Sequence, residues 1–306
     1  MPGGRRQVVT GAFGYTGRYL AKRLLATGHE VATLTGRSAA DSPFGRQVAV
    51  MPWSFDRPEV LEANLRGTEV LYNTYWVRFC HGATTFDTAV ANTRILIAAA
   101  RAAGVRRIVQ VSITNPSLDS KLPYFRGKAQ VEQVVVESGL SYAIVRPAVI
   151  FGVEDILINN IAWLLRRLPV FGLFGDGRYP IQPIFVEDFA ELLVQAGRDR
   201  QNTVIDAVGP EVFSYADLVS LIGRTVGSRA GIIRVPPVVG LAIGTVLGWA
   251  VGDVVITGDE IRGLMDGLLV SHDPPTGSSA LSDWLARNAQ TVGMKYACEL
   301  KRHYGG

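Results

Sequence analysis

The chain has 306 residues, 48% of them hydrophobic and 19% charged, which is enough for one large α/β domain and a smaller region with its own core. Its net charge of +4 is spread along the sequence instead of forming a basic stripe, so we expect no nucleic-acid partner. Two cysteines, Cys80 and Cys298, and four scattered histidines predict neither a disulfide framework nor a metal site.

In the first half of the chain, short β-branched runs alternate with helical stretches, which is the pattern of βαβ units on a parallel sheet. No long apolar leader precedes the first run, so we expect a cytoplasmic protein. The predicted strands are Gln7–Thr10, Val31–Thr35, Gln47–Met51, Glu69–Asn73, Arg107–Val111 and Tyr142–Arg146. The predicted helices are Tyr15–Ala26, Pro58–Leu65, Thr85–Ala103 and Pro123–Glu137. The expected fold is therefore α/β, a Rossmann-like doubly wound parallel sheet.

After residue 151 the alternation gives way to a mostly helical, substrate-side region. The predicted helices are Ile156–Leu168, Tyr215–Thr225, Val238–Gly252, Gly258–Leu268 and Ser279–Ala289. Strands near Pro183–Val186 and Thr203–Ala207 are expected to return to the main sheet. Asp188 is interpreted as a helix N-cap. Arg166 and Arg167 are interpreted as part of the polar face of a helix, with binding of an anionic substrate as the alternative. The predicted domains are residues 1–150 with about 184–210 for the nucleotide, and 151–183 with 211–306 for the substrate side.

A glycine-rich turn, TGAFGYTG at residues 10–17, lies between the first strand and the first helix. Gly11 permits a tight turn, Gly14 lets backbone N–H groups approach a pyrophosphate, and Gly17 lets the helix pack on the strand. The spacing departs by one residue from G-x-G-x-x-G. The position of this turn in the βαβ pattern predicts a dinucleotide site.

The second strand ends in Leu34-Thr35-Gly36-Arg37-Ser38, where an NAD site usually carries a carboxylate for the ribose 2′-hydroxyl. Arg37 instead offers a planar cation suited to a 2′-phosphate, and Ser38 could add a hydroxyl. An arginine after a strand can also be a solvated loop residue. The chemistry predicts NADP(H) in preference to NAD(H).

Tyr124 and Lys128 lie four residues apart on the helix after the fifth strand and therefore share a face. A neighbouring ammonium stabilises a phenolate and brings tyrosine into range for proton transfer near neutrality. Ser112 and Thr114, just past the fifth strand, share a face and could bind a substrate oxygen. Pro147 follows the sixth predicted strand, at another carboxyl end where ligands of doubly wound sheets bind.

Residues 238–252 form an uncharged segment that is too short to span a bilayer comfortably. Glycine recurs there every fourth residue, at Gly240, Gly244, Gly248 and Gly252, so one helix face is smooth enough for close approach of another backbone. The segment is interpreted as a tightly packed helix of the second domain. The alternative is a helix that docks on a membrane surface or a partner.

Four motifs together carry a family resemblance: TGAFGYTG, VSITNPSLDSKLPYFRGKA, SGLSYAIVRPAVIFG and PIFVEDFA. The chain resembles the atypical branch of the extended short-chain dehydrogenase/reductase superfamily. It is similar to bacterial NAD-dependent epimerase/dehydratase-like proteins and to the NADPH-binding accessory subunit of respiratory complex I. The resemblance covers nearly the whole chain, strongly through about Asp188.

The resemblance implies a Rossmann fold with Tyr124 as acid–base residue, Lys128 on the nicotinamide ribose and Pro147 near the nicotinamide. By strand position Thr114 matches the family's hydroxyl residue better than Ser112, and both remain candidates. The implied nucleotide contacts are Gly11, Phe13, Gly14, Tyr15, Thr16, Gly17, Arg37, Ser38 and Asn73. Ser54-Phe55-Asp56 replaces the family's adenine-binding pattern, and Asn73-Thr74-Tyr75-Trp76 replaces a small apolar run, which narrows the nicotinamide side.

Two functions of different classes follow. The first is an NADP(H)-dependent oxidoreductase or epimerase acting on a small-molecule substrate that is apolar or sugar-like. The second is a non-catalytic NADPH-binding structural or assembly protein, docking on a membrane or respiratory complex through residues 236–252 and lying peripheral to the inner membrane.

Overall fold

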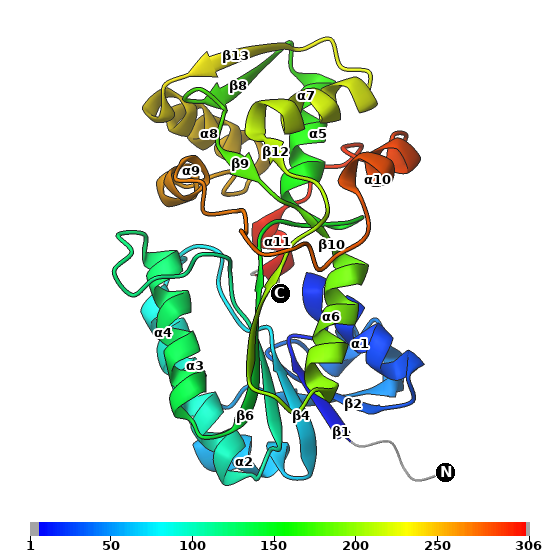
Figure 1. The fold of residues 1–306 in the computed structure, drawn as a ribbon, viewed down its shortest axis with the longest axis vertical. Helices are drawn as coiled ribbons and strands as arrows, with labels where there is room; N and C mark the ends of the chain where they lie inside the picture. Colours follow the sequence, from blue (N-terminus) through cyan, green and yellow to red (C-terminus); the bar gives the residue numbers. More distant parts are fainter. Residues whose placement is uncertain (1–5, 304–306) are drawn as a thin grey trace. The chain divides into compact units, whose positions relative to one another are not determined.

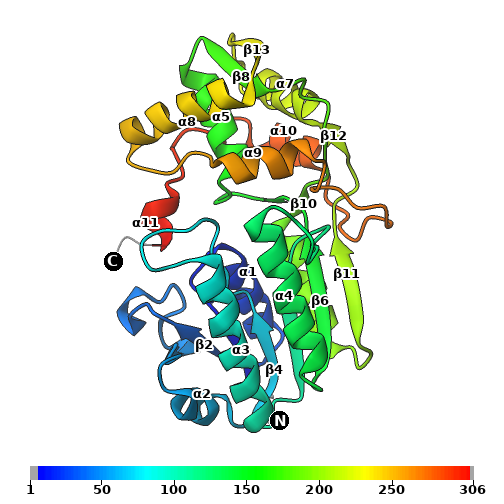
Figure 2. The same ribbon diagram turned by 90° about the vertical axis from the view of Figure 1, so that its left-hand side faces the viewer.

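The structure is a computed structural model that describes residues 6–303 (Figures 1 and 2). The expectation that no apolar leader precedes the first strand rests partly on residues 1–5, which lie outside that range. The chain divides into two compact units. The first unit contains residues 1–147 and 189–206, and the second contains residues 148–188 and 207–306.

A seven-stranded sheet forms the first unit, in the order β11-β6-β5-β4-β1-β2-β3. The strands are β1 (Arg6–Thr10), β2 (Glu30–Thr35), β3 (Val48–Pro52), β4 (Thr68–Asn73), β5 (Arg107–Val111), β6 (Ser141–Pro147) and β11 (Thr203–Ala207). Every pairing among β1 to β6 is parallel. This order, with the sheet running outward in both directions from β1 and β4, is that of a doubly wound dinucleotide fold and confirms the predicted class. The carboxyl ends of these parallel strands meet at one edge of the sheet.

Helices cover both faces of this sheet (Figure 1). They are α1 (Tyr15–Ala26), α2 (Pro58–Leu65), α3 (Phe86–Ala102), α4 (Pro123–Glu137) and α6 (Val186–Arg198), with short turns η1 (Ala39–Asp41) and η2 (Gly45–Gln47). On one face α3 packs between α2 and α4. On the other face α1 and α6 are joined by an ion pair of 2.9 Å between Arg23 and Glu191. The bounds of α1, α2 and α4 are those predicted.

Within residues 148–188 and 207–303, the second unit contains three two-stranded sheets and six helices. Its strands are β7 (Ile150–Phe151), β8 (Val170–Phe174), β9 (Pro180–Ile181), β10 (Ile184–Phe185), β12 (Phe213–Ser214) and β13 (Gly231–Val235). Its helices are α5 (Leu157–Arg167), α7 (Tyr215–Thr225), α8 (Pro237–Val251), α9 (Gly258–Met265), α10 (Leu281–Asn288) and α11 (Glu299–His303). Its own apolar core includes Phe151, Ile158, Leu218 and Trp284.

One of the two strands expected to return to the main sheet does so, and the other does not. β11 pairs with β6 at the sheet edge, as expected. β10 pairs instead with β7, bringing Ile184 opposite Ile150 and Phe185 opposite Phe151. Because α6 begins at Val186, immediately after β10, the chain has only two residues in strand geometry there and cannot extend a long ladder.

Candidate functional site

The glycine-rich turn at the carboxyl end of β1 is fixed by backbone hydrogen bonds. Gly11 has a φ of +68°, a left-handed conformation that favours glycine. Its N–H donates to the Leu34 carbonyl of β2 at 2.8 Å, and its carbonyl accepts from Gly14 N–H at 2.9 Å. The chain therefore reverses from β1 into α1 within a single locked turn.

Helix α1 packs directly on this turn at Gly17. A Cβ at Gly17 would collide with the carbonyl oxygen of Gly11, so the close approach requires glycine. Gly14 is the N-cap; among the described residues no side chain caps α1, and none in its first turn is acidic. Phe13 is buried, while Tyr15 and Thr16 open the helix half-buried. The backbone N–H groups of this helix start are thus suited to an anion such as a pyrophosphate, which the residues present fit.

Arg37 follows β2 and reaches back to the same turn. Its guanidinium Nη1 donates to the Phe13 carbonyl at 3.4 Å, and its backbone N–H donates to Thr35 Oγ1 at 3.1 Å. The side chain is exposed, so its charge is accessible to a ligand. Ser38 instead caps η1, its hydroxyl accepting from Ala40 N–H at 3.2 Å. The Arg37 side chain therefore bonds the glycine turn, whereas the Ser38 hydroxyl bonds η1.

Three aromatic rings gather where β3 and β4 end, a feature that the sequence analysis missed. Trp53 lies 5.5 Å from Phe55 and 4.9 Å from Tyr75, measured between ring centres. A Cβ at Gly36 would lie 3.1 Å from the Trp53 ring, so this ring packs against the chain leaving β2. Between the rings, Ser54 is buried with a φ of 44°, and its hydroxyl has no partner among the described residues.

Asn73, expected at the nucleotide, uses its amide inside the protein. Its Oδ1 accepts from the Thr10 hydroxyl at 2.9 Å, and its Nδ2 donates to Gln110 Oε1 at 2.8 Å. The Thr10 hydroxyl also accepts from the N–H groups of Thr74 at 2.7 Å and Tyr75 at 3.0 Å. This fully buried network ties the end of β1 to the end of β4 beside the glycine turn.

Lys128 is buried beneath the carboxyl edge of the sheet, with 3% of its surface exposed. Its Nζ donates to the Val111 carbonyl at the end of β5, at 3.2 Å, and lies 4.6 Å from the centre of the Trp76 ring. Burial lowers the pKa of Lys128 to about 7, while the charge of Glu132 opposes this shift. Glu132 itself accepts two bonds from Arg146, at 2.9 and 2.6 Å, so its charge is already neutralised by another cation.

Tyr124 stands one turn before Lys128, near the start of α4. Its ring meets Trp76 and Phe86 edge-on, at 5.9 and 5.7 Å between centres. A Cβ at Gly127 would lie 2.9 Å from the Trp76 ring, so Trp76 lies directly against α4 between the two candidate residues. The indole thus contacts both Tyr124 and Lys128, and nothing local in the sequence links position 76 to α4.

Ser112 and Thr114 lie just beyond β5 and are both buried. Their N–H groups donate to the carbonyls of Val145 at 2.8 Å and Pro147 at 3.1 Å, which continues the contact with β6 past the end of the sheet ladder. The Ser112 hydroxyl has no hydrogen-bond partner among the described residues. The ends of β4, β5 and β6 therefore carry Trp76, Ser112 with Thr114, and Pro147, in the unit that also holds Tyr124 and Lys128.

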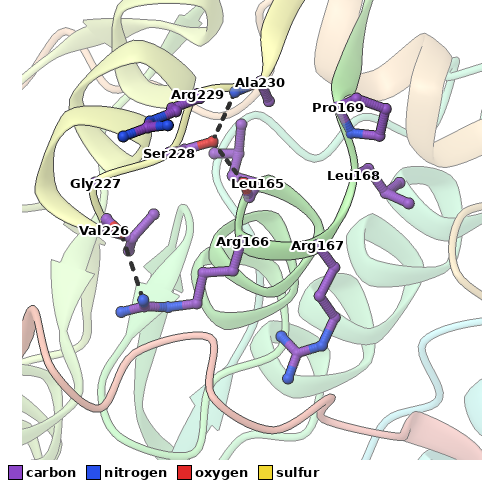
Figure 3. Close-up of a pocket in the computed structure, with 10 residues that line it drawn as sticks. All are labelled: Leu165, Arg166, Arg167, Leu168, Pro169, Val226, Gly227, Ser228, Arg229 and Ala230. Atoms are coloured by element: carbon purple, nitrogen blue, oxygen red, sulfur yellow. Dashed lines mark hydrogen bonds between the residues drawn. The ribbon is translucent and has the colours of Figure 1, made fainter.

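A separate hollow of about 490 Å³ lies in the second unit (Figure 3). It is lined by residues 165–169 and 226–230. Arg166 and Arg167, considered from the sequence for an anionic substrate, bind backbone carbonyls instead: Arg166 those of Ala289 and Val292, Arg167 those of Gly293 and Met294. Their guanidinium groups therefore hold residues 289–294 in place. None of the candidate nucleotide residues lines the hollow.

Metal-binding clusters and membrane-spanning helices are absent from residues 6–303. Among these residues no group of three or more His, Cys, Asp or Glu side chains is arranged to hold a metal ion. None of the helices in this range is both long and apolar enough to cross a membrane. Asp188, interpreted from the sequence as a helix N-cap, lies inside α6 and accepts from the N–H groups of Ser278 at 2.8 Å and Ser279 at 2.7 Å.

Comparison with known proteins agrees with this geometry. Residues 11–154 match the NAD(P)H-binding family model. The chain is 27% identical over 252 residues to NADH dehydrogenase (ubiquinone) 1 alpha subcomplex subunit 9, mitochondrial, of Arabidopsis thaliana, covering 76% of this chain and 62% of that protein. It is 27% identical over 269 residues to the NADH-ubiquinone oxidoreductase 40 kDa subunit, mitochondrial, of Neurospora crassa, covering 85% and 70%. These matches confirm the resemblance inferred from the four motifs.

Among solved structures, the fold is similar to the Citrobacter sp. triphenylmethane reductase complexed with NADP(H). The TM-score is 0.73, with 16% identity over 93% of this chain and 99% of the reductase. At that identity the match shows a shared fold. The alignment with the Arabidopsis protein spans less than two thirds of that relative's length.

Proposed function

We propose that this chain, whose residues 11–154 carry an NAD(P)H-binding domain, binds NADP(H) in preference to NAD(H) and exchanges a hydride between the nicotinamide and an oxygen-bearing carbon. The observation that carries the catalytic part is the buried Lys128, one helical turn beyond Tyr124 and bonded to the end of β5. A lysine one helical turn from a tyrosine on the same helix face is the spacing that acid–base chemistry of this kind uses.

For the nucleotide, the start of α1 would hold the pyrophosphate on its backbone N–H groups, between Gly11 and Gly17. Arg37 is the candidate for the 2′-phosphate because its guanidinium already lies beside the glycine turn. Ser38, Phe13, Tyr15 and Thr16 flank that position. Pro147 is proposed at the nicotinamide end. Asn73, whose amide bonds Thr10 and Gln110, is proposed to support the site from inside the protein.

For the chemistry, a reduced nicotinamide bound at this site would supply a hydride to a carbonyl carbon of the substrate. Tyr124 donates its phenolic proton to the carbonyl oxygen, which completes an alcohol, and the reverse direction oxidises the alcohol. Lys128 stabilises the phenolate that remains and would hold the ribose. Thr114 or Ser112 would bind the reacting oxygen, and the unpartnered hydroxyl of Ser112 supports its inclusion. Return of the hydride to the opposite face would make the net reaction an epimerisation.

The test of the cofactor assignment is the affinity of the purified chain for NADPH and for NADH. We expect wild type to prefer NADPH, and Arg37→Ala to lose about tenfold or more in NADPH affinity with little change for NADH. Arg224→Ala, an exposed arginine on α7, is the matched control and should bind like wild type. Equal affinities for the two nucleotides in wild type would refute the assignment.

The test of the catalytic assignment is a screen of apolar ketones and sugar-like carbonyls for NADPH oxidation. Tyr124→Phe should abolish turnover while leaving NADPH affinity within a few-fold of wild type, because the ring packing against Trp76 and Phe86 is retained. Turnover that survives Tyr124→Phe would exclude Tyr124 as the acid.

A second candidate function is favoured by Trp76, whose ring contacts both Tyr124 and Lys128. In this alternative the nucleotide is structural and the protein acts by docking on a membrane or respiratory complex, peripheral to the inner membrane on its cytoplasmic side. Tight NADPH binding that raises the unfolding temperature, with no turnover of any carbonyl in the screen, would favour this alternative. Substitution of Trp76 by Ala would then give no activity either.

A further inference from the structure

The glycine face of α8 is covered by the protein itself. A Cβ at Gly240 would collide with the Phe174 ring, one at Gly244 would lie 2.8 Å from Ile256, and one at Gly248 would lie 2.6 Å from the Asp253 carbonyl. Gly252 lies outside the helix as its left-handed C-cap, with a φ of 65°. The interpretation of a tightly packed helix is therefore right for this face, and a partner cannot use it.

The opposite face of α8 is exposed and apolar. Its large side chains have exposed fractions of 79% for Val238, 48% for Ile243, 59% for Val246 and 81% for Trp249, and Val239 is 45% exposed. No charged residue occurs from Val235 to Gly252. An exposed helix of a globular protein normally places charged or polar residues on the side away from the core, and α8 places none there. A contiguous apolar surface of this kind marks an interaction site.

The only hydroxyl on α8 does not alter this surface. Thr245 Oγ1 donates to the Leu241 carbonyl of the same helix at 2.9 Å, so its polar atom is satisfied internally. The backbone groups along the body of the helix are likewise bonded within it. Apart from the indole N–H of Trp249, the exposed face therefore offers no free side-chain hydrogen-bonding group, and an indole N–H is a group that the interfacial region of a membrane accommodates. The rest of this face suits a hydrocarbon environment.

Charge and length identify the kind of membrane contact. Arg234 is exposed three residues before the helix, Arg229 is exposed before β13, and Trp249 stands in the last turn of α8, as expected for a cationic flank and an interfacial aromatic anchor. The 15 residues of α8 span about 22 Å, less than the roughly 30 Å of a bilayer core. We infer that α8 lies in the plane of a bilayer surface, with Val238, Ile243, Val246 and Trp249 inserted among the lipids.

This inference rests on the exposed face of the second unit and is independent of the nucleotide chemistry. The experiment is co-sedimentation of the full chain with vesicles of phosphatidylcholine, alone or mixed with phosphatidylglycerol. Wild type should bind both, and more tightly when phosphatidylglycerol is present. Val246→Glu should weaken binding about tenfold or more, because it places a charge in the inserted face. The matched control is Val212→Glu, since Val212 is 56% exposed against 59% for Val246 and lies outside α8.

Two further measurements make the result specific. Replacing both Arg229 and Arg234 by Ser should remove the preference for phosphatidylglycerol while retaining the weaker binding to neutral vesicles. Trp249→Phe should remove the blue shift of tryptophan emission that vesicles produce in wild type. Absence of vesicle binding by the folded wild type, equal binding by Val246→Glu, or self-association through this face in sedimentation velocity would overturn the inference. NADPH affinity measured on the same samples reports separately on the nucleotide site.

Discussion

The ammonium nitrogen of Lys128 lies 4.6 Å from the centre of the Trp76 ring, although 52 residues separate the two in the chain. Burial brings the pKa of Lys128 to about 7, so the charge beside the indole changes near neutral pH. We expect the emission of Trp76 to change with pH around a midpoint near 7. The difference spectrum between wild type and Trp76→Phe isolates this ring from the other four tryptophans. The transition should be absent in Lys128→Met, and its persistence there would show that another group titrates.

The same burial predicts a pH dependence of stability. In the folded chain Lys128 loses its proton near pH 7, whereas in the unfolded chain it does so near its ordinary value of 10.5. Between these values the unfolded state binds one more proton, so the free energy of unfolding should rise with pH by about 1.4 kcal/mol per unit. Below pH 7 Lys128 is protonated in both the folded and the unfolded state. Its contribution to the free energy of unfolding is then constant and most destabilising.

Denaturant unfolding of Lys128→Met at several pH values between 7 and 10 checks this slope. The variant should lack it, so that its advantage over wild type shrinks as the pH rises. Lys22→Met, which alters an exposed lysine on α1, should keep the wild-type dependence. Parallel curves for wild type and Lys128→Met would contradict a neutral, buried Lys128.

Thr10→Val should strongly destabilise the first unit, although the two side chains have the same shape. The Thr10 hydroxyl serves the N–H groups of Thr74 and Tyr75 and the amide of Asn73, and the side chain is fully buried. Valine would leave the Thr74 N–H without its acceptor and would remove one of two partners from the Tyr75 N–H and from Asn73 Oδ1, which also bond each other at 3.2 Å, at a cost of about 1–3 kcal/mol. Thr245→Val, at an exposed position whose hydroxyl bonds only its own helix, should change the free energy of unfolding by under about 0.5 kcal/mol.

Gly17→Ala should disrupt the glycine turn, because the added methyl group would meet the Gly11 carbonyl. We expect a loss of about 2–3 kcal/mol in stability together with loss of nucleotide binding. The matched substitution is Gly223→Ala in α7, where the nearest atom, of Leu165, would lie at an ordinary 4.0 Å. There alanine should be neutral or stabilising, since it is the better helix former. Normal NADPH affinity in Gly17→Ala would remove the turn from the nucleotide site.

Arg166→Leu should release the C-terminal segment of the second unit. The guanidinium of Arg166 holds the Ala289 and Val292 carbonyls, and Asn160 bonds both the N–H and the carbonyl of Ala297. Without the cation, backbone hydrogen exchange across residues 289–297 should accelerate, with about 1–3 kcal/mol of stability lost. Arg224→Leu, exposed on α7, should leave exchange there unchanged. Unaltered exchange in Arg166→Leu would mean that the segment is held by other contacts.

The parts of the fold that could be predicted from sequence are those with local signals. Pro58 and Pro123 mark the starts of α2 and α4, and the short β-branched runs between the helices became β1 to β6 with shifts of one residue at most at each end. The small sheets of the second unit gave no such signal. β8 and β13 pair although their paired residues are 61 positions apart, and β7, β9, β10 and β12 have two residues each.

No range was predicted for helix α6, and Asp188, expected as its N-cap, lies inside its first turn, although the signal for the helix is present. Buried Val186, Phe189, Ala190, Leu193 and Val194 recur at the spacing of one helix face. The strand predicted near Pro183–Val186 overlaps the first residue of this helix. In the site, the spacing of Tyr124 and Lys128 follows from helix geometry, whereas the contact of both with Trp76 depends on how β4 and α4 come together. Such a contact has no trace in the local sequence.

The division of the chain into two units has a consequence for synthesis on the ribosome. The sheet of the first unit is completed by β11, at residues 203–207, after the chain has already produced residues 148–188 of the second unit. Until then β6 is an edge strand with unpaired backbone groups, and α6 is not in place on the sheet. During synthesis the first unit therefore cannot complete its sheet until residues 203–207 have been made. A chain truncated after residue 150 would keep every candidate nucleotide residue but would leave backbone groups of β6 unpaired. We therefore expect this truncated chain to aggregate instead of binding the nucleotide.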